Sequence, residues 1–349
     1  MNKYLLAIET SCDDTSVALL KPQGEVAVLQ AANQDFVHRV FGGVVPEIAS
    51  RNHALHLPPM INEVLKSSNI GWNQIESIAV TNRPGLIGSL IVGTVVAKTL
   101  AQVHNIPFIG VNHLEGHILA PLLRDAQWAP PAGFGFPFLA LAVSGGHTSI
   151  YRVEDWGKYF VLGRTRDDAA GEAFDKFGKM LGLGFPGGAE VDRLAQNGDP
   201  SAYQFPHGLT HEKNLMMSFS GMKSSAQRLV EKLGAEQIQS KRSDLCASFQ
   251  EAVVDTLIEK LDRAVTQEKL QRVIITGGVS ANSRLRSKAE SWANRRGLQL
   301  VIPPLRYCTD NAAMIGLAGQ WRMTKGQRSG LDLAPMASSA PGDFIEEIK

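Results

Sequence analysis

The segment "VNHLEGH", residues 111–117, places two histidines four positions apart with a glutamate between them. On a helix, side chains four apart share one face, so His113 and His117 can bind one metal ion through their imidazoles. Zinc peptidases carry their catalytic glutamate directly after the first histidine, near the metal-bound water. Here Glu115 follows two places later, about 200° around a helix, which counts against a peptidase. A structural pair in a core or on a surface fits the spacing too.

A metal site needs at least a third protein ligand, and the candidates are carboxylates or His147. Asp310, in "RYCTDNAAMIG", stands at the start of an apolar stretch with helical character. An aspartate at this position is also typical of a helix cap. The residues alone therefore leave the third ligand open.

A second group of carboxylates lies in "RTRDDAAGEAFDKFGKML". We expect a helix here, with Asp168, Glu172 and Asp175 within about 60° of one another on one face. Stacked like charges destabilise a helix, so the stripe needs partners. A cation or the hydroxyls of a substrate would serve, and so would solvent together with Lys176 and Lys179.

Glycine-rich turns suggest ligand contacts through the backbone. The turn in "VSGGH" can direct N–H groups inward as a nest for phosphate oxygens. In "GLGFPGGAEVDRLA" the glycines permit close approach to a ligand, or only a tight connection between helices. The turn in "ETSCDDT" offers hydroxyls and carboxylates instead, and a Walker P-loop pattern does not occur.

Composition limits the classes of protein that remain. With 349 residues, two lobes are expected, and 44% apolar residues allow each a substantial core. The net charge of +1 predicts no general electrostatic attraction for nucleic acid or membranes, so an RNA partner needs a local patch or another subunit.

Three scattered cysteines and the absence of an apparent secretory signal favour a cytoplasmic protein. The longest apolar run, at residues 85–101, is interrupted by Lys98 and falls short of a membrane span.

Two segments share one form, an apolar strand, a tight polar turn and a second strand. They are "LLAIETSCDDTSVALLK" and, further along, "FLALAVSGGHTSIYRV". One such hairpin at the head of each half indicates a duplicated α/β architecture, although two unrelated hairpins would look alike. A third strand, "QRVIITGG", leads through glycines into a helix with a stop at Gly297. The Pro/Gly-rich piece at residues 129–137 is the expected lobe boundary.

Taken together, ten segments resemble the tRNA threonylcarbamoyladenosine transferase family, once described as O-sialoglycoprotein endopeptidase. In chain order they are "IETSCDDT", "FGGVVPEIASRNH", "RPGLIGSLIVG", "NHLEGH", "LAVSGGHTS", "DDAAGEAFDK", "GFPGG", "SFSGMKS", "TGGVSAN" and "CTDNAAMIG". The resemblance implies the actin-like ATPase fold of sugar kinases and Hsp70, with two duplicated lobes and an active-site cleft between them. We expect residues 1–128, completed by 310–349, to form the first lobe, and residues 129–309 the second.

The resemblance also implies the residues of the site. His113, His117 and Asp310 would bind one divalent metal ion, iron(II) in preference to zinc. ATP or an adenylate would be held by residues of the second lobe, which are Ala142, Val143, Ser144, Gly145, Gly146, Asp175, Gly188, Asp192 and Asn282. The general base stays open, with Asp13 and Glu9 as candidates.

The implied reaction moves an L-threonylcarbamoyl group from threonylcarbamoyl-AMP to the exocyclic amine of the adenosine just 3′ of the anticodon. The tRNAs concerned read codons starting with A, and AMP leaves. A smaller paralogue of the same fold and a P-loop ATPase would assist, without a membrane. Two alternatives remain, a metal-dependent glycoprotein endopeptidase and a nucleotide-dependent regulator of the actin-like class.

Overall fold

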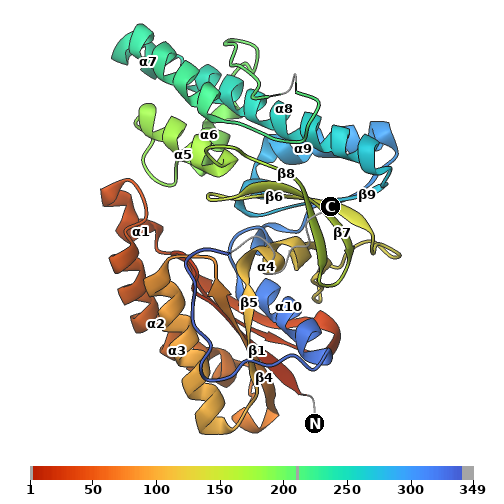
Figure 1. Ribbon diagram of the computed structural model, residues 1–349. Coiled ribbons are helices and arrows are strands. Elements are labelled where there is room, and N and C mark those ends of the chain that lie inside the picture. Colours follow the sequence, from red (N-terminus) through yellow and green to blue (C-terminus); the bar gives the residue numbers. More distant parts are fainter. Residues whose placement is uncertain (1–2, 210–211, 340–349) are drawn as a thin grey trace. The chain divides into compact units, whose positions relative to one another are not determined.

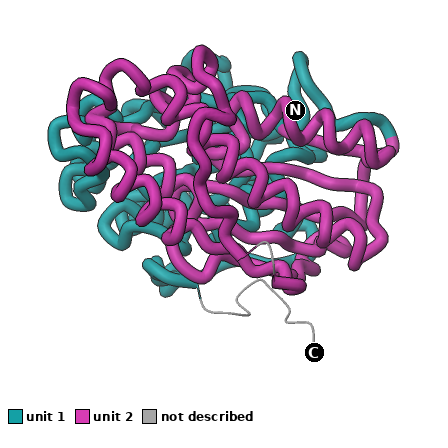
Figure 2. Tube along the Cα trace, turned by 90° about the horizontal axis from the view of Figure 1, so that it is seen from above, with its two compact units in different colours: residues 1–132, 303–344 teal, residues 133–302, 345–349 magenta. Residues whose placement is uncertain are grey.

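The chain forms two compact units, which Figure 2 colours separately. The computed structural model describes residues 3–209 and 212–339. The first unit ends at Ala132, inside the Pro/Gly-rich segment, and the chain returns to it at Pro303. We propose that these units are the two predicted lobes, with the return at Pro303 in place of Asp310.

The first unit is built on a five-stranded sheet with the order β3-β2-β1-β4-β5. Strands β1 and β2 form the first expected hairpin, β3 continues it antiparallel, and β4 and β5 run parallel to β1. The strands are β1 (Tyr4–Glu9), β2 (Thr15–Leu20), β3 (Val26–Ala32), β4 (Ile75–Arg83) and β5 (Phe108–Asn112). The helices are α1 (Asp35–His38), α2 (Pro46–Ser67), α3 (Ile87–His104), α4 (His113–Leu119) and α10 (Ala312–Thr324) (Figure 1).

The second unit repeats this topology. Its sheet has the order β8-β7-β6-β9-β10, in which β6, β7 and β8 are antiparallel and β9 and β10 run parallel to β6. The strands are β6 (Phe138–Val143), β7 (Thr148–Asp155), β8 (Lys158–Arg164), β9 (Arg272–Thr276) and β10 (Gln299–Val301). The helices are α5 (Ala170–Met180), α6 (Gly187–Ala195), α7 (Ser220–Ser240), α8 (Arg242–Glu268) and α9 (Ser283–Arg296). The duplication expected from the two hairpins is therefore confirmed.

Apolar side chains of β1 alternate between the two faces of the first sheet, and each face is covered by helices. Leu6 and Ile8 join the apolar core that α2 and α3 cover. Ala7, on the other face, lies against α10, where a Cβ at Gly316 would come within 3.1 Å of the Ala7 Cβ. Because side chains of a strand alternate between faces, helices on both sides bury nearly all of β1 and β2, whereas the edge strand β3 stays partly exposed. Small residues facing α10 let this helix lie close to the strands.

Helix α3 carries the apolar run for which the sequence predicted too little length for a membrane span. By length and composition it does pass as one candidate span among the described residues, so that prediction is corrected. A helix packed on a sheet passes the same test, and α3 contacts β4, β5 and α2. One such helix is weak evidence for a membrane span.

The close packing of α10 yields a first prediction. A Cβ at Gly319 would lie 2.5 Å from the Cβ of Ala79, whereas a Cβ at Gly221, near the start of α7, would meet nothing within 4 Å. We expect Gly319→Ala to lower the free energy of unfolding by about 1–3 kcal/mol through overpacking. Gly221→Ala should leave it unchanged or raise it by up to about 1 kcal/mol. Urea unfolding measures both, and equal effects would contradict this account.

Candidate functional site

The two histidines lie on one short helix that follows β5 directly, His113 at its first position and His117 in its last turn. Helix α4 starts at His113, and Asn112 caps it by accepting a 2.9 Å hydrogen bond from the Leu114 amide. Asp310 lies two residues before α10, whose cap is Asn311, since that side chain accepts from the Met314 amide. Asn311 therefore takes the capping role that the sequence left open for Asp310.

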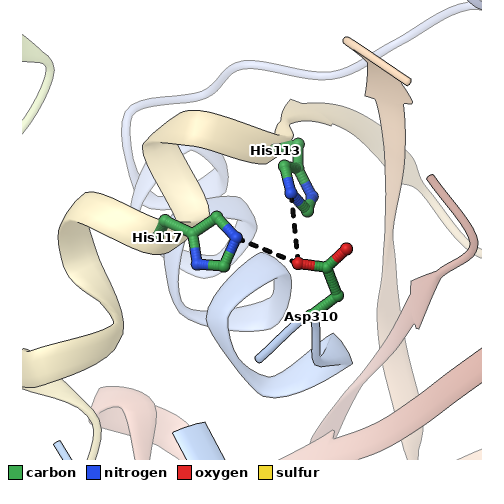
Figure 3. Close-up of side chains that lie close together, drawn as sticks. All are labelled: His113, His117 and Asp310. Atoms are coloured by element: carbon green, nitrogen blue, oxygen red, sulfur yellow. Dashed lines mark hydrogen bonds and ion pairs between the residues drawn. The ribbon is translucent and has the colours of Figure 1, made fainter. Parts of the chain in front are cut away.

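The three side chains converge on a single point in the first unit (Figure 3). The Nε2 atoms of His117 and His113 lie 3.0 Å and 3.4 Å from the same Asp310 oxygen. The rings are nearly perpendicular, with centroids 4.6 Å apart. One ligand atom from each residue lies within 4.8 Å of the others, and both histidines are buried. Two imidazole nitrogens and a carboxylate oxygen at this spacing fit a single divalent ion.

The buried carboxylate of Glu9 contacts the Nδ1 atom of His113, whose Nε2 atom faces Asp310. Glu9 Oε2 lies 3.1 Å from His113 Nδ1 and accepts a 2.5 Å hydrogen bond from the Thr81 hydroxyl. The other Glu9 oxygen accepts from the Ser11 amide, and the Ser11 hydroxyl lies 3.1 Å from the same His113 nitrogen. Carboxylates in this position orient metal-binding histidines by fixing their tautomer. Glu9, which the sequence analysis considered as a general base, thus lies where it orients His113.

Electrostatics reinforce the arrangement. Burial lowers the pKa of His113, but the charges of Asp310 and Glu9 outweigh burial and hold that pKa well above its usual value. Burial raises the pKa of Asp310, but His113 and His117 outweigh it and keep that pKa well below the usual range. The two carboxylates therefore favour a positive charge between them, which a divalent cation also supplies.

Glu115, the residue of the peptidase question, points to another partner. Its side chain is buried, and Oε2 accepts a 2.8 Å hydrogen bond from Nε of Arg322 on α10. The ion pair joins α4, which carries both histidines, to α10, which follows Asp310. Helical geometry predicted that this acid faces away from the histidines, and its pairing with Arg322 agrees.

The turn between β1 and β2 borders the metal group through Ser11. His53, on α2, holds this turn, with its Nδ1 atom 2.7 Å from the Thr15 hydroxyl and its Nε2 atom 2.9 Å from the Cys12 carbonyl oxygen. Burial, followed by the charges of Asp310 and Asp13, raises the pKa of Asp14 to about 8. Sequence reasoning missed His53, because a lone histidine on a helix carries no signal of a contact 41 residues away.

In the second unit, the expected phosphate turn is formed between β6 and β7. Ala142 and Val143 are buried strand residues, so only their backbones can face a ligand. The Ser144 carbonyl accepts from the Gly171 amide near the start of α5, which fixes the turn. A Cβ at Gly145 or Gly146 would meet nothing within 4 Å, so the space before both residues is open.

Hydrogen bonds hold the remaining predicted nucleotide residues within the second unit. Asp175 accepts a 2.9 Å hydrogen bond from the amide of Gly188, so these two predicted residues are neighbours. Asp192 accepts from both the amide and the hydroxyl of Ser283, directly after Asn282. Asn282 caps α9 and donates a 2.8 Å hydrogen bond to Gln250. These bonds join α5 to α6 and α6 to α9.

The predicted carboxylate stripe is wrong in one part. Helix α5 begins at Ala170, so Asp168 precedes the helix instead of sharing its face. Its carboxylate binds Lys176 and Lys223 at 2.9 Å and 2.7 Å, and Glu172 also pairs with Lys176. The lysine alternative thus holds in part, because Lys176 pairs with Asp168 and Glu172 but the second lysine is Lys223, and Asp175 lies separately beside Gly188.

Solved structures agree with the actin-like expectation for the fold. The activator of the 2-hydroxyisocaproyl-CoA dehydratase from Clostridium difficile with bound ADPNP is 12% identical, with a TM-score of 0.52 over 93% of this chain and 97% of that chain. Full-length HypF in its phosphate- and nucleotide-bound form, also 12% identical, gives 0.57 over 97% of this chain and 47% of that chain. At this identity they show the fold alone, which is the α/β actin-like ATPase fold.

Sequence relatives cover almost the whole chain. The family model for tRNA N6-adenosine threonylcarbamoyltransferase matches residues 25–317. Proteins of that name are 58% identical in Bdellovibrio bacteriovorus, over 99% of this chain and 100% of the relative, and 46% identical in Geobacter metallireducens, over 94% of each. The chain therefore belongs to the tRNA N6-adenosine threonylcarbamoyltransferase family.

Proposed function

We propose that the chain transfers the L-threonylcarbamoyl group from threonylcarbamoyl-AMP to the exocyclic amine of the adenosine just 3′ of the anticodon, in tRNAs that read codons starting with A. AMP is the leaving group. The observation that carries this proposal is the convergence of the buried His113 and His117 with the half-buried Asp310 in a chain of this family. The donor is an activated mixed anhydride, so a covalent enzyme intermediate is unnecessary.

His113, His117 and Asp310 would hold one divalent ion, with iron(II) favoured over zinc. When bound, such an ion supplies Lewis-acid polarisation of a carbamoyl or phosphate oxygen. Glu9 and Ser11 orient the His113 ring, because both contact its Nδ1 atom and leave Nε2 facing Asp310. The oxygens of Glu9 are engaged by buried partners, so Asp13 is our candidate for the base that accepts the amine proton.

The second unit would hold the adenylate. In the turn between β6 and β7 the Ser144 amide donates to the His147 carbonyl, and the backbone N–H groups of Gly145 and Gly146 can stabilise charge growing on the departing AMP phosphate. The backbone of Ala142 and Val143 leads into this turn. Asp175, Gly188, Asp192 and Asn282 would contact the ribose and adenine, and hydrogen bonds within the second unit hold these residues in place.

Partners complete the proposal. We infer that tRNA binds with the help of a smaller paralogue of the same fold and a P-loop ATPase, in the cytoplasm. The near-neutral net charge of +1 supports this division, since the chain by itself offers little overall attraction for RNA. The peptidase alternative lacks support, because Glu115 is paired with Arg322.

Reconstitution of the modification tests the reaction. Purified chain, donor-forming enzyme, both helpers and unmodified tRNA should yield threonylcarbamoyladenosine, measured by mass spectrometry of digested tRNA. His113→Ala should lower the rate at least about 100-fold, because second-layer changes alone cost about 10–100-fold. Gly221→Ala, at an exposed open position, is the matched control. Undiminished product without the chain would refute the proposed reaction.

Metal analysis tests the ligand set separately. We expect about one ion per chain, lost in His117→Ala and in Asp310→Ala, because two protein ligands do not retain an ion tightly. His147→Ala, outside the group, should keep the full content. Inductively coupled plasma mass spectrometry gives both metal identity and stoichiometry. Full metal content in His117→Ala would rule out this assignment.

Adenylate binding tests the turn of the second unit. Gly145→Asp adds a carboxylate where space is open, so packing is kept while phosphate oxygens are repelled. We expect at least a roughly ten-fold weaker Kd for AMP by calorimetry, equivalent to about 1.4 kcal/mol. Gly221→Asp introduces the same charge at another open position and should bind AMP normally. Equal affinities of both variants would exclude the turn as the phosphate site.

A further inference from the structure

The segment after α10, residues 327–339, lies along the free edge of the first sheet. Strand β5 is the last strand of that sheet, so its outward backbone groups lack a strand partner. The Ser329 amide donates to the Phe108 carbonyl at 2.9 Å, and the Ser329 hydroxyl accepts from the Gly110 amide at 3.0 Å. Leu333 packs on Gly110, where a Cβ would come within 2.8 Å of it. The segment thereby covers the edge of β5.

The same segment next crosses the end of β4. The Met336 amide donates to the Asn82 carbonyl at 2.9 Å, and the Asn82 side chain donates to the Ala334 carbonyl at 3.3 Å. The Ala337 carbonyl accepts from the amide of Gly85, which precedes α3. These bonds fix the segment where β4 and β5 end, and α4 begins there too.

Its last described residue reaches the metal helix. The Asn112 side chain donates a 2.8 Å hydrogen bond from Nδ2 to the Ser339 hydroxyl. The other end of that amide, Oδ1, caps α4 by accepting from the Leu114 amide. Asn112 is only 2% exposed, so this single side chain links the segment to the start of the helix that carries both histidines.

The beginning of the segment reaches the same helix by another route. Arg322 donates from Nη1 to the Gln327 side chain at 3.0 Å and from Nε to Glu115 at 2.8 Å. Glu115 lies in the first turn of α4. The segment is therefore joined to α4 at both of its ends, through Arg322 and Glu115 and through Ser339 and Asn112.

We propose that residues 327–339 are a clasp that sets the position of α4 and thereby the metal affinity, with Asn112 and Ser339 as positioning residues. Helix α4 has seven residues, and a helix this short has little stability of its own. Its orientation must come from its cap and its contacts. The inference rests on the metal site given under the proposed function.

Cobalt(II) titration tests the clasp, with the ion alone as the probe. Ser339→Ala removes the acceptor of the Asn112 amide, so we expect on the order of ten-fold weaker cobalt(II) affinity by chelator competition. The visible absorption bands of the bound ion should also shift. Ser338→Ala changes an exposed neighbour and is the matched control. Ser339→Thr keeps a hydroxyl and should restore most of the affinity.

Hydrogen–deuterium exchange gives a readout that does not depend on the ion. Residues 113–119 should exchange faster in Ser339→Ala than in Ser338→Ala, with closely similar Tm values. Truncation after Gln327 should increase both effects. Faster exchange with unchanged cobalt(II) affinity would overturn the link to the metal site, and wild-type exchange would overturn the clasp. A wild-type chain that binds no cobalt(II) would instead refute the metal site, while exchange would still decide the clasp.

Discussion

The buried carboxylate of Glu9 is the constraint on which the first unit depends. An isolated charge in an apolar interior costs several kcal/mol, so each oxygen of this side chain must have a partner. The partners come from three elements: Thr81 on β4, His113 on α4 and the Ser11 amide after β1. Satisfying one carboxylate therefore brings together the ends of two strands and the metal helix. The same contact places His113, the first of the proposed metal ligands.

The two units use one topology for different chemistry. Each has a hairpin, then two strands parallel to the first, and each hairpin turn lies where the first strand ends. In the first unit this turn holds hydroxyls and carboxylates next to imidazoles. In the second it holds Gly145 and Gly146, with open space before the backbone. Duplication thus supplied one scaffold, and the composition of a few turn residues separates a proposed cation site from a proposed phosphate site.

Patterns within short segments predicted the hairpins, the third strand with its glycine turn and the Gly297 stop, because each depends on local periodicity and turn chemistry. The spacing of His113 and His117 suits a helix, which the sequence analysis assumed and the structure contains as α4. Contacts between distant residues escaped this reasoning, such as Glu115 with Arg322 and His53 with Cys12. Asp168 was placed in a helix because charge spacing continued past its start, whereas pairing with Lys223, 55 residues away, holds it outside.

The residues between the two histidines are explained by packing. A Cβ at Gly116 would lie 2.9 Å from Ile315 and 3.0 Å from Met314, so only glycine lets α4 lie this close to α10. Glu115 then meets Arg322 across the same contact. Asp310 precedes α10, so the distance between these helices also sets the distance between Asp310 and the histidines. The glutamate of "HLEGH" therefore supports the proposed metal group by joining two helices. Activating a metal-bound water, as the glutamate of a zinc peptidase does, would require a side chain on the opposite face of α4.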